Sequence, residues 1–262
     1  MILRRVKPAL RPLVLCCSGH DPTGGAGIHA DIEAVAANGA HALSLITAHT
    51  VQDTQDVVRA VPVAPILLAS QIETLLADSA ISAIKIGLLG EAAQIAVLVD
   101  AIRKTGVPTV LDPILRAGGG TNLASSALQA SVQNDLLTHI TVLTPNAAEA
   151  RRLTRRESLD DCGKALLDAG VKHVLITGGD EPGERVINHW YTADAPVKRF
   201  EWPRLSANFH GAGCTLAAAI AARLACDQAI ESALEQAQRY THESLARAFR
   251  TGKGRLIPGR IA

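Results

Sequence analysis

Aromatic residues are scarce in this sequence: Phe, Trp and Tyr together make up 3% of its 262 residues. Hydrophobic residues still account for 48%, so a core has to be built mainly from Ala, Leu, Ile and Val. A chain of this length suits one large α/β domain better than two small domains. We therefore expect residues 1–262 to form a single domain, with residues 1–12 as a flexible N-terminal extension.

An excess of one charge and a long apolar run are both missing. The 26 basic and 25 acidic residues leave a formal net charge of +1, which predicts neither a nucleic-acid surface nor an acidic partner. No apolar run approaches the length that spans a membrane, and Pro8 and Pro12 interrupt the basic N-terminus, unlike an export signal. We expect neither nucleic acid nor a membrane among the partners.

Paired cysteine motifs are absent as well. The chain has five cysteines, an odd number, and no C-x-x-C pair, which argues against zinc-finger and disulfide-scaffold proteins. The nine histidines show no metal-ligand spacing. Free thiols are typical of a reducing compartment, so we expect the protein in the cytoplasm.

Short apolar runs alternate with longer Ala-rich segments. This pattern predicts a mostly parallel central sheet with helices on both faces, and ligands collect beyond the carboxyl ends of the strands in such sheets. The expected strands cover 13–17, 42–48, 83–89, 108–113, 140–145 and 172–179, followed by a hairpin over 185–193 and 197–204. The expected helices cover 26–39, 65–79, 92–106, 159–170, 214–225 and 227–248.

A glycine-rich turn, Gly211-Ala212-Gly213, leads into an Ala-rich helix with Cys214 at the join. A helix N-terminus exposes unpaired N–H groups and binds phosphate readily, and it stabilises a thiolate. The alternative is an ordinary loop-to-helix join with a small buried cysteine.

A second glycine cluster, "DPTGGAG", precedes another helix and is followed by Asp31. Asp31 could accept a hydrogen bond from an amine or hydroxyl of a ligand, or it could pair with the helix dipole. The glycine spacing does not fit G-x-G-x-x-G, and no G-K-[ST] follows either cluster.

The motifs "SGHDPTGGAGIHADI", "ITAHTVQDT", "IKIGLLG", "LDPIL", "LTPNAAEA", "ITGGD" and "NFHGAGCTLAAAIA" occur in this order. Together they resemble the hydroxymethylpyrimidine/phosphomethylpyrimidine kinases of thiamine biosynthesis, which have the ribokinase-like fold. The resemblance covers the chain from Leu13 to about Ala248. It implies ATP-dependent phosphorylation of 4-amino-5-hydroxymethyl-2-methylpyrimidine and, as is usual in the family, of its monophosphate.

The resemblance also implies roles at the pyrimidine. Asp31 and Gln52 would hold the edge of the ring, Gly19 would place its backbone against it, and Leu88 would pack on it. Gln52 taken alone could equally be a solvated turn residue.

Phosphoryl transfer depends on positioning and charge neutralisation more than on covalent chemistry. The amides of Gly211, Ala212 and Gly213 would form an anion hole for the transferred group. Cys214, with a pKa lowered at the helix start, would accept or orient the proton of the substrate hydroxyl.

At the nucleotide, Glu149 resembles the N-x-x-E residue that places Mg²⁺ through water, and Asn146 would order the same shell. The alternative is a helix start, with Pro145 at its first position. Asp112 could reach the metal or phosphate region, or could cap a turn before a proline.

The "TGGD" stretch would bring Thr177 and Gly179 to the nucleotide, although many relatives have Lys where Thr177 stands. Arg116 or Lys253 could supply the missing charge. Ala212 and Phe209 are further departures, since Thr is common at both places.

A loop has to close over the site to exclude water, and the glycine-rich stretches at 118–120 and 178–183 are candidates. Relatives are commonly dimers, so a homodimer is expected. Two alternative functions remain: a pyridoxal or pyridoxine kinase of the same fold, and a non-catalytic ligand-binding relative.

Overall fold

The computed structural model describes residues 10–114 and 124–261. Residues 1–9 of the expected extension, Arg116 and the glycines at 118–120 lie outside the described residues. Within them, none of the helices is long and apolar enough to cross a membrane. All five cysteines carry free thiols.

One sheet runs through the described part of the chain, with nine strands in the order β3-β2-β1-β4-β5-β6-β7-β8-β9. The strands from β2 to β7 in this order are parallel neighbours, while β3, β8 and β9 pair antiparallel at the two edges. The predicted mostly parallel sheet and its closing hairpin are therefore confirmed. The strands are β1 (Leu13–His20), β2 (His41–Gln52), β3 (Val57–Pro62), β4 (Ala83–Ile86), β5 (Thr109–Leu111), β6 (Val142–Leu143), β7 (His173–Ile176), β8 (Arg185–Thr192) and β9 (Ala195–Pro203).

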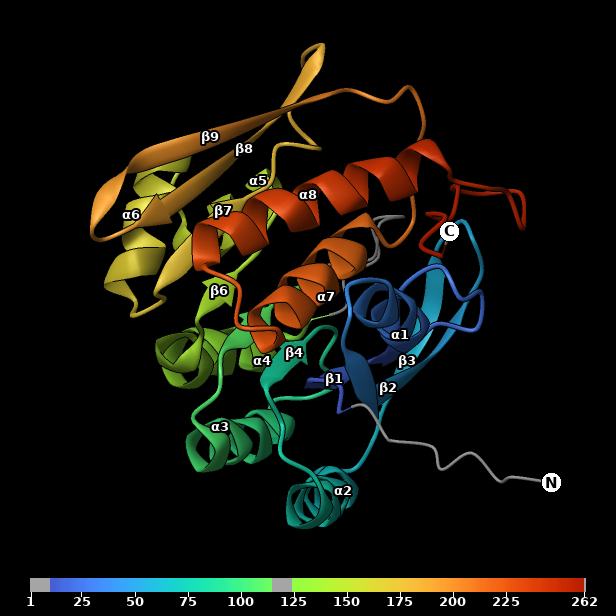
Figure 1. Cartoon of the computed structure of the whole chain (residues 1–262), viewed down its shortest axis with the longest axis vertical. Helices are drawn as coiled ribbons and strands as arrows, with labels where there is room; N and C mark the ends of the chain where they lie inside the picture. Colours follow the sequence, from blue (N-terminus) through green and yellow to red (C-terminus); the bar gives the residue numbers. More distant parts are fainter. Residues whose placement is uncertain (1–9, 115–123, 262) are drawn as a thin grey trace, which may run out of the picture.

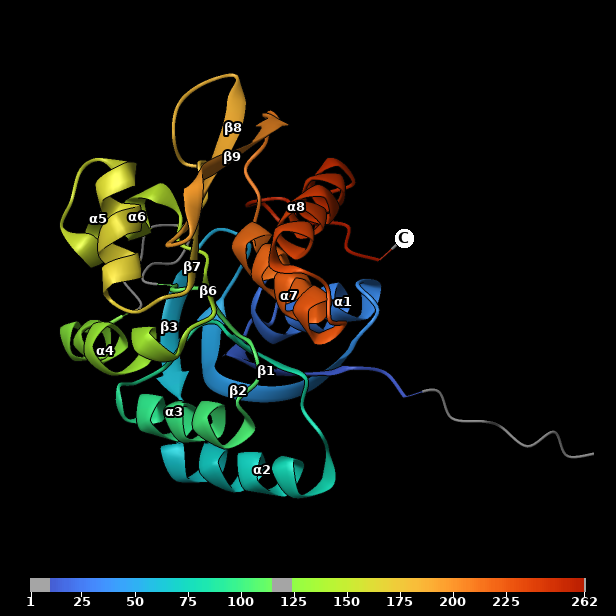
Figure 2. The ribbon, with the colours of Figure 1, turned by 60° about the vertical axis from the view of Figure 1, so that its left-hand side comes forward.

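Helices cover both faces of this sheet (Figures 1 and 2). Alternate residues of β1 supply two separate cores: Val14 and Cys16 pack with α1, α7 and α8, while Leu15 and Cys17 pack with α2 and α3. This period of two is the geometry of a strand buried on both sides. The helices are α1 (Gly27–Ala37), α2 (Pro65–Asp78), α3 (Ala93–Thr105), α4 (Ser126–Ser131), α5 (Ala147–Thr154), α6 (Leu159–Asp168), α7 (Ala212–Ala225) and α8 (Ile230–Ala246).

Helix α7 explains why the chain needs so few aromatic residues. It lies between α1, α8 and the sheet, and its residues from Leu216 to Ala222 are at most 5% exposed. Alanine side chains let a helix approach its neighbours closely, so a helix buried on all sides is built without bulky residues. This packing fixes the start of α7 close to the start of α1.

Several elements differ from the sequence expectation. Strand β3 was not expected, because only Val57 of its first residues is buried and Val58 is 81% exposed. α4 continues into a π-helical turn (Val132–Leu136) and a 3₁₀ turn (Leu137–His139), and a full helix α5 follows β6. Helix α1 ends at Ala37, two residues before the end of the expected range, and Gly39 follows its C-cap at φ +90°.

Candidate active site

A cavity of about 520 Å³ lies beyond the carboxyl ends of the parallel strands. Both glycine-rich turns line it, as do residues from α5, from β8 and β9, and from the segment after α8. The structure brings together the expected site residues except Asp31 around this cavity: Gly19, Gln52, Leu88, Asp112, Asn146, Glu149, Thr177, Gly179, Gly211, Ala212, Gly213 and Cys214.

Asp31 is the exception: it does not line the cavity, and its contact with the pyrimidine edge stays a prediction. Its side chain is 0% exposed and points from α1 toward the sheet. The Nζ of Lys85 lies 2.7 Å from one carboxylate oxygen, and the hydroxyl of Ser18 donates to the other at 2.5 Å. Asp31 follows Gly27 by about one helical turn, which aims it at the core beneath the cavity.

Lys85 is a functional candidate that the sequence analysis passed over. It pairs in register with Cys16 of β1, so its side chain points to the face that α1 covers. Burial disfavours its charge, but the carboxylate of Asp31 outweighs this and raises the pKa of Lys85. A fixed cation therefore lies under the cavity. The sequence does contain a pattern that points to Lys85. It stands between two isoleucines in a strand expected to be buried, and a buried lysine is rare without a charged partner.

The two glycine turns touch each other. Gly211 caps α7 at φ +87°, and a Cβ there would lie 1.9 Å from the carbonyl oxygen of Gly25. A Cβ on Gly27 would lie 2.1 Å from the carbonyl oxygen of Gly19. Only glycine fits at these two positions. The N-termini of α1 and α7 consequently meet at the middle of the cavity.

Arg260, near the end of the chain, lies behind these turns. Its guanidinium is buried and donates to the carbonyl oxygens of Gly24 and Gly25 and, at 2.8 Å, to the hydroxyl of Thr215. Thr215 in turn donates to the carbonyl oxygen of Gly211 at 2.7 Å. One arginine thus ties both turns together.

Cys214 is the third residue of α7 and is 5% exposed. Burial raises the pKa of its thiol to about 12, although Lys85 and a hydrogen bond from the N–H of Gly27 act in the opposite direction. The expected lowering of this pKa by the helix N-terminus is therefore wrong, because desolvation outweighs the helix dipole. The thiol is protonated near neutral pH.

Asp112 follows β5 and lines the cavity, and its carboxylate is the candidate proton acceptor of the site. Burial raises its pKa to about 6, while Lys85 and a hydrogen bond with Cys214 lower it. Its Oδ2 is buried without a hydrogen-bond partner among the described residues. Gly213 lies above it, where a Cβ would be 3.3 Å from that oxygen.

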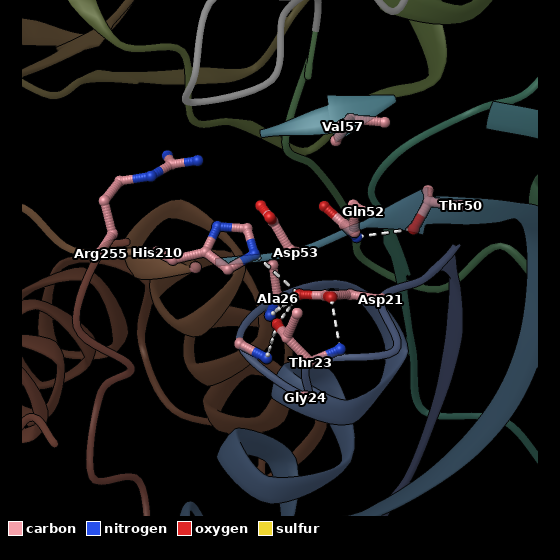
Figure 3. A network of polar contacts seen from close by, with 12 residues as sticks. Asp21, Thr23, Gly24, Ala26, Thr50, Gln52, Asp53, Val57, His210 and Arg255 are labelled. Carbon is pink, nitrogen blue, oxygen red and sulfur yellow. Dashed lines mark hydrogen bonds and ion pairs between the residues drawn. The ribbon is translucent and has the colours of Figure 1, made fainter. Parts of the chain in front are cut away.

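Asp21 holds the first glycine turn and was not singled out from the sequence. Its carboxylate accepts hydrogen bonds from the N–H groups of Thr23 and Ala26, both at 2.8 Å. It also lies 2.8 Å from Nε2 of His210, just before α7 (Figure 3). Burial raises the pKa of Asp21, but these partners outweigh it and the pKa is lowered.

The walls near β2 fit an aromatic ring with a polar edge. Leu88 packs on Gly19, where a Cβ would lie 2.7 Å from the leucine Cδ2. The carboxamide of Gln52 donates to the hydroxyl of Thr50 at 2.7 Å and lines the cavity with Val57 (Figure 3).

The start of α5 forms the opposite end of the cavity. Asn146 caps the helix by accepting from the N–H of Glu149 at 2.8 Å, and Glu149 accepts from the N–H of Asn146 at 3.0 Å. The helix begins at Ala147. Pro145 therefore precedes the cap instead of occupying the first helical position, and the capping box coexists with a place in the cavity wall.

The loop at 178–183, proposed above as a closing segment, is tied down in this conformation. Arg204 donates to the carbonyl oxygens of Gly179, Glu181 and Gly183 at 2.9, 2.6 and 2.6 Å. Arg151 pairs with the carboxylate of Glu181 at 2.7 Å. A closing movement of this loop would have to break these contacts.

Comparison with known proteins decides the family. A family model described as phosphomethylpyrimidine kinase matches residues 21–258. The chain belongs to this family. It is 33% identical, over 251 residues, to the hydroxymethylpyrimidine/phosphomethylpyrimidine kinase of Rhizobium meliloti, covering 93% of this kinase and 94% of the relative.

Solved structures agree with this assignment. A phosphomethylpyrimidine kinase from Clostridium difficile superposes with a TM-score of 0.78 at 28% identity, covering 90% of this kinase and 100% of that chain. The pyridoxal kinase of Staphylococcus aureus in complex with AMP-PCP gives a TM-score of 0.87 at 23% identity, covering 96% and 94%. The second likeness supports the ribokinase-like fold alone.

Proposed function

We propose that this kinase transfers the γ-phosphoryl group of ATP to the hydroxymethyl group of 4-amino-5-hydroxymethyl-2-methylpyrimidine, and then phosphorylates the monophosphate, in thiamine biosynthesis. The observation that carries the proposal is the shape of one cavity. Its end at Gln52 and Leu88 suits a small polar ring, its end at α5 suits a nucleotide, and the N-terminus of α7 lies between them.

The ring would lie on Leu88 and the backbone of Gly19, with the Gln52 carboxamide at its polar edge. A carboxamide offers both a donor and an acceptor, which matches the amino group and ring nitrogen of an aminopyrimidine. Asp31, held by Lys85, would lie beneath this pocket.

The nucleotide end fits Mg²⁺ carried by ATP. Among the described residues, no group of three or more His, Cys, Asp or Glu could hold a metal alone, and Mg²⁺ prefers one or two carboxylates with phosphates and waters. Glu149 would supply the carboxylate, with Asn146 beside it and Thr177 and Gly179 at the phosphates. The ion would neutralise phosphate charge during transfer.

Proton transfer would use Asp112 and Cys214 together. As the substrate oxygen bonds the γ-phosphorus and the bond to ADP breaks, the hydroxyl proton passes through the Cys214 thiol to Asp112. Asp112 suits this step because burial raises its pKa toward the neutral range, which makes its carboxylate a stronger proton acceptor. The N–H groups from Ala212 to Cys214 would stabilise the transferred group.

A homodimer through the β3 edge belongs to the proposal. Val58, Val61 and Val51 on β3 and β2 are 81%, 43% and 48% exposed, and an uncovered edge strand with apolar residues favours association. Light scattering after size exclusion should give twice the chain mass for the wild type and a monomer for Val58→Asp. A monomeric wild type would refute the dimer. The free cysteines support the cytoplasm as the location.

The function is tested by coupled ADP release with three acceptors side by side: the hydroxymethylpyrimidine, its monophosphate and pyridoxal. We expect turnover with both pyrimidines and kcat/KM for pyridoxal at least tenfold lower. Preference for pyridoxal would replace the proposal by the vitamin B6 kinase, and ADP release with none of the three would favour a binding protein.

A further inference from the structure

A segment from the end of the chain brings one arginine to the pyrimidine end of the cavity. The N–H of Arg255 donates to the carbonyl oxygen of Thr54 at 3.0 Å, and its guanidinium donates to the carbonyl oxygen of Gln55 at 3.1 Å. Gly254 lies so close that a Cβ would be 2.1 Å from the Thr54 oxygen. The segment is therefore laid tightly on the turn after β2, and Arg255 lines the cavity.

His210 lies on the same side of the cavity. Figure 3 shows Arg255 and His210 projecting from one side, across from Gln52 and Val57. The imidazole is 8% exposed and its Nε2 contacts Asp21 at 2.8 Å, so the ring has a fixed position.

A second arginine among the described residues of the cavity wall is already engaged in hydrogen bonds. Arg204 donates to several carbonyl oxygens of the 178–183 loop. The guanidinium of Arg255 donates to the Gln55 carbonyl through one nitrogen, although a guanidinium carries five N–H donors. Burial lowers the pKa of Arg255, and the charges of Asp56 and Asp21 only partly compensate.

The two phosphoryl acceptors of the proposed function, the hydroxymethylpyrimidine and its monophosphate, differ in what they offer to Arg255. The hydroxymethyl substrate has no anionic group for a guanidinium, whereas a phosphate monoester carries nearly two negative charges and three acceptor oxygens. Arginine binds phosphate through two parallel hydrogen bonds. The phosphates of ATP belong to the other end of the cavity, near α5.

We propose that Arg255, with His210 beside it, forms a phosphate subsite that holds the phosphate of the monophosphorylated pyrimidine. This rests on the proposed function. Arg255 would therefore contribute to binding of the substrate of the second phosphorylation, but not to binding of the substrate of the first. The same chemistry could serve a phosphate of ATP, so the test compares both sources.

The test uses Arg255→Gln and Arg255→Lys in the full chain, with steady-state kinetics for each pyrimidine and for ATP. We expect Arg255→Gln to raise the KM for the monophosphate about tenfold to a hundredfold, the usual effect of losing hydrogen bonds to a charged group. The KM values for the alcohol and for ATP should stay within about twofold. Arg255→Lys should keep part of the affinity, because lysine retains the charge but not the paired geometry.

Arg156→Gln is the matched control, because it removes an exposed arginine between α5 and α6 that does not line the cavity. It should leave all three KM values unchanged. An equal rise of both pyrimidine KM values in Arg255→Gln would make Arg255 a general pocket residue, and a rise in the ATP KM would assign it to the nucleotide. Either result overturns the subsite.

Calorimetric titration of the monophosphate without ATP separates this proposal from the function. Wild-type binding that is weakened at least tenfold in Arg255→Gln supports the subsite even if turnover fails. Wild-type protein that phosphorylates the alcohol but does not bind the monophosphate keeps the function and refutes the subsite.

Discussion

The ammonium group of Lys85 lies 2.7 Å from the carboxylate of Asp31, and neither side chain is exposed to solvent. The pair joins β4 to α1 directly beneath the first glycine turn. Removing one partner of a buried pair leaves a desolvated charge, whereas replacing both by apolar residues of similar size is far less costly.

This pair predicts the outcome of a double-mutant cycle. Lys85→Met alone should lower the free energy of unfolding by about 3–5 kcal/mol, measured by urea denaturation. Lys85→Met combined with Asp31→Leu should recover most of that loss. Activity should stay low in the double variant, since the cation under the cavity is gone. A double variant with full kcat would show that the pair serves only the fold.

Cys214 is predicted to act as a thiol and not as a preformed thiolate. Because its pKa is raised to about 12, iodoacetamide at pH 7.5 should alkylate it much more slowly than the same cysteine in unfolded protein. The partly exposed Cys226 should be replaced by serine first to remove background. Rapid alkylation of Cys214 in the folded Cys226→Ser protein would contradict the assignment.

The same cysteine has a predicted kinetic role. Cys214→Ala should lower kcat by about two to four orders of magnitude, and Cys214→Ser should lose less, because a hydroxyl can still pass a proton to Asp112. Steady-state ADP release measures both, with circular dichroism as the folding control. Near-normal turnover in Cys214→Ala would reduce the residue to a packing role.

The sequence predicted most strands and helices in their order along the chain, without β3, α4 and α5, and it located the cavity. Parallel strands bring their carboxyl ends to one edge, so motifs after separate strands had to meet there. It left the direction of the Asp31 side chain open, because a helical position near a glycine turn can face either the cavity or the core. The facing residue, Lys85, is 54 positions away, and only the pairing of β1 with β4 decides between them.

Contacts between segments far apart in the chain could not be predicted from the sequence either. His210 meets Asp21 across 189 positions, and Arg260 meets Gly25 across 235. No spacing rule connects such residues. The raised pKa of Cys214 also needed the structure, since the helix dipole can be inferred from sequence while the extent of burial cannot.

Asp21 predicts a pH dependence of stability. Its folded pKa is lowered despite burial, so its contribution is complete above the unfolded value of about 3.9 and is lost as the pH falls through the lower folded value. Thermal unfolding of the wild type should therefore shift downward between pH 5 and pH 3 more than that of Asp21→Asn. Asp78→Asn, at an exposed position of α2, should titrate like the wild type. Parallel curves for all three proteins would contradict the prediction.

The turn before α7 contains two glycines with different predicted roles, Gly211 for the stability of the fold and Gly213 for activity. Gly211 has φ +87°, and a Cβ would lie 1.9 Å from the Gly25 oxygen, so Gly211→Ala should destabilise the fold. A side chain at positive φ alone costs about 1–3 kcal/mol, and the clash adds to it. Urea denaturation should show this loss clearly.

Gly213 is exposed and has no positive φ, and a Cβ there would meet nothing closer than Asp112 at 3.3 Å. Gly213→Val should therefore fold with a free energy of unfolding close to that of the wild type. Its side chain would occupy the space that the transferred phosphoryl group needs, so kcat should fall by at least two orders of magnitude, because an anion hole acts mainly in the transition state. A folded Gly213→Val enzyme with unchanged kcat would move phosphoryl transfer away from this turn. Ala212→Thr, which restores a side chain common in the family, should keep wild-type kcat and serves as the control in the same turn.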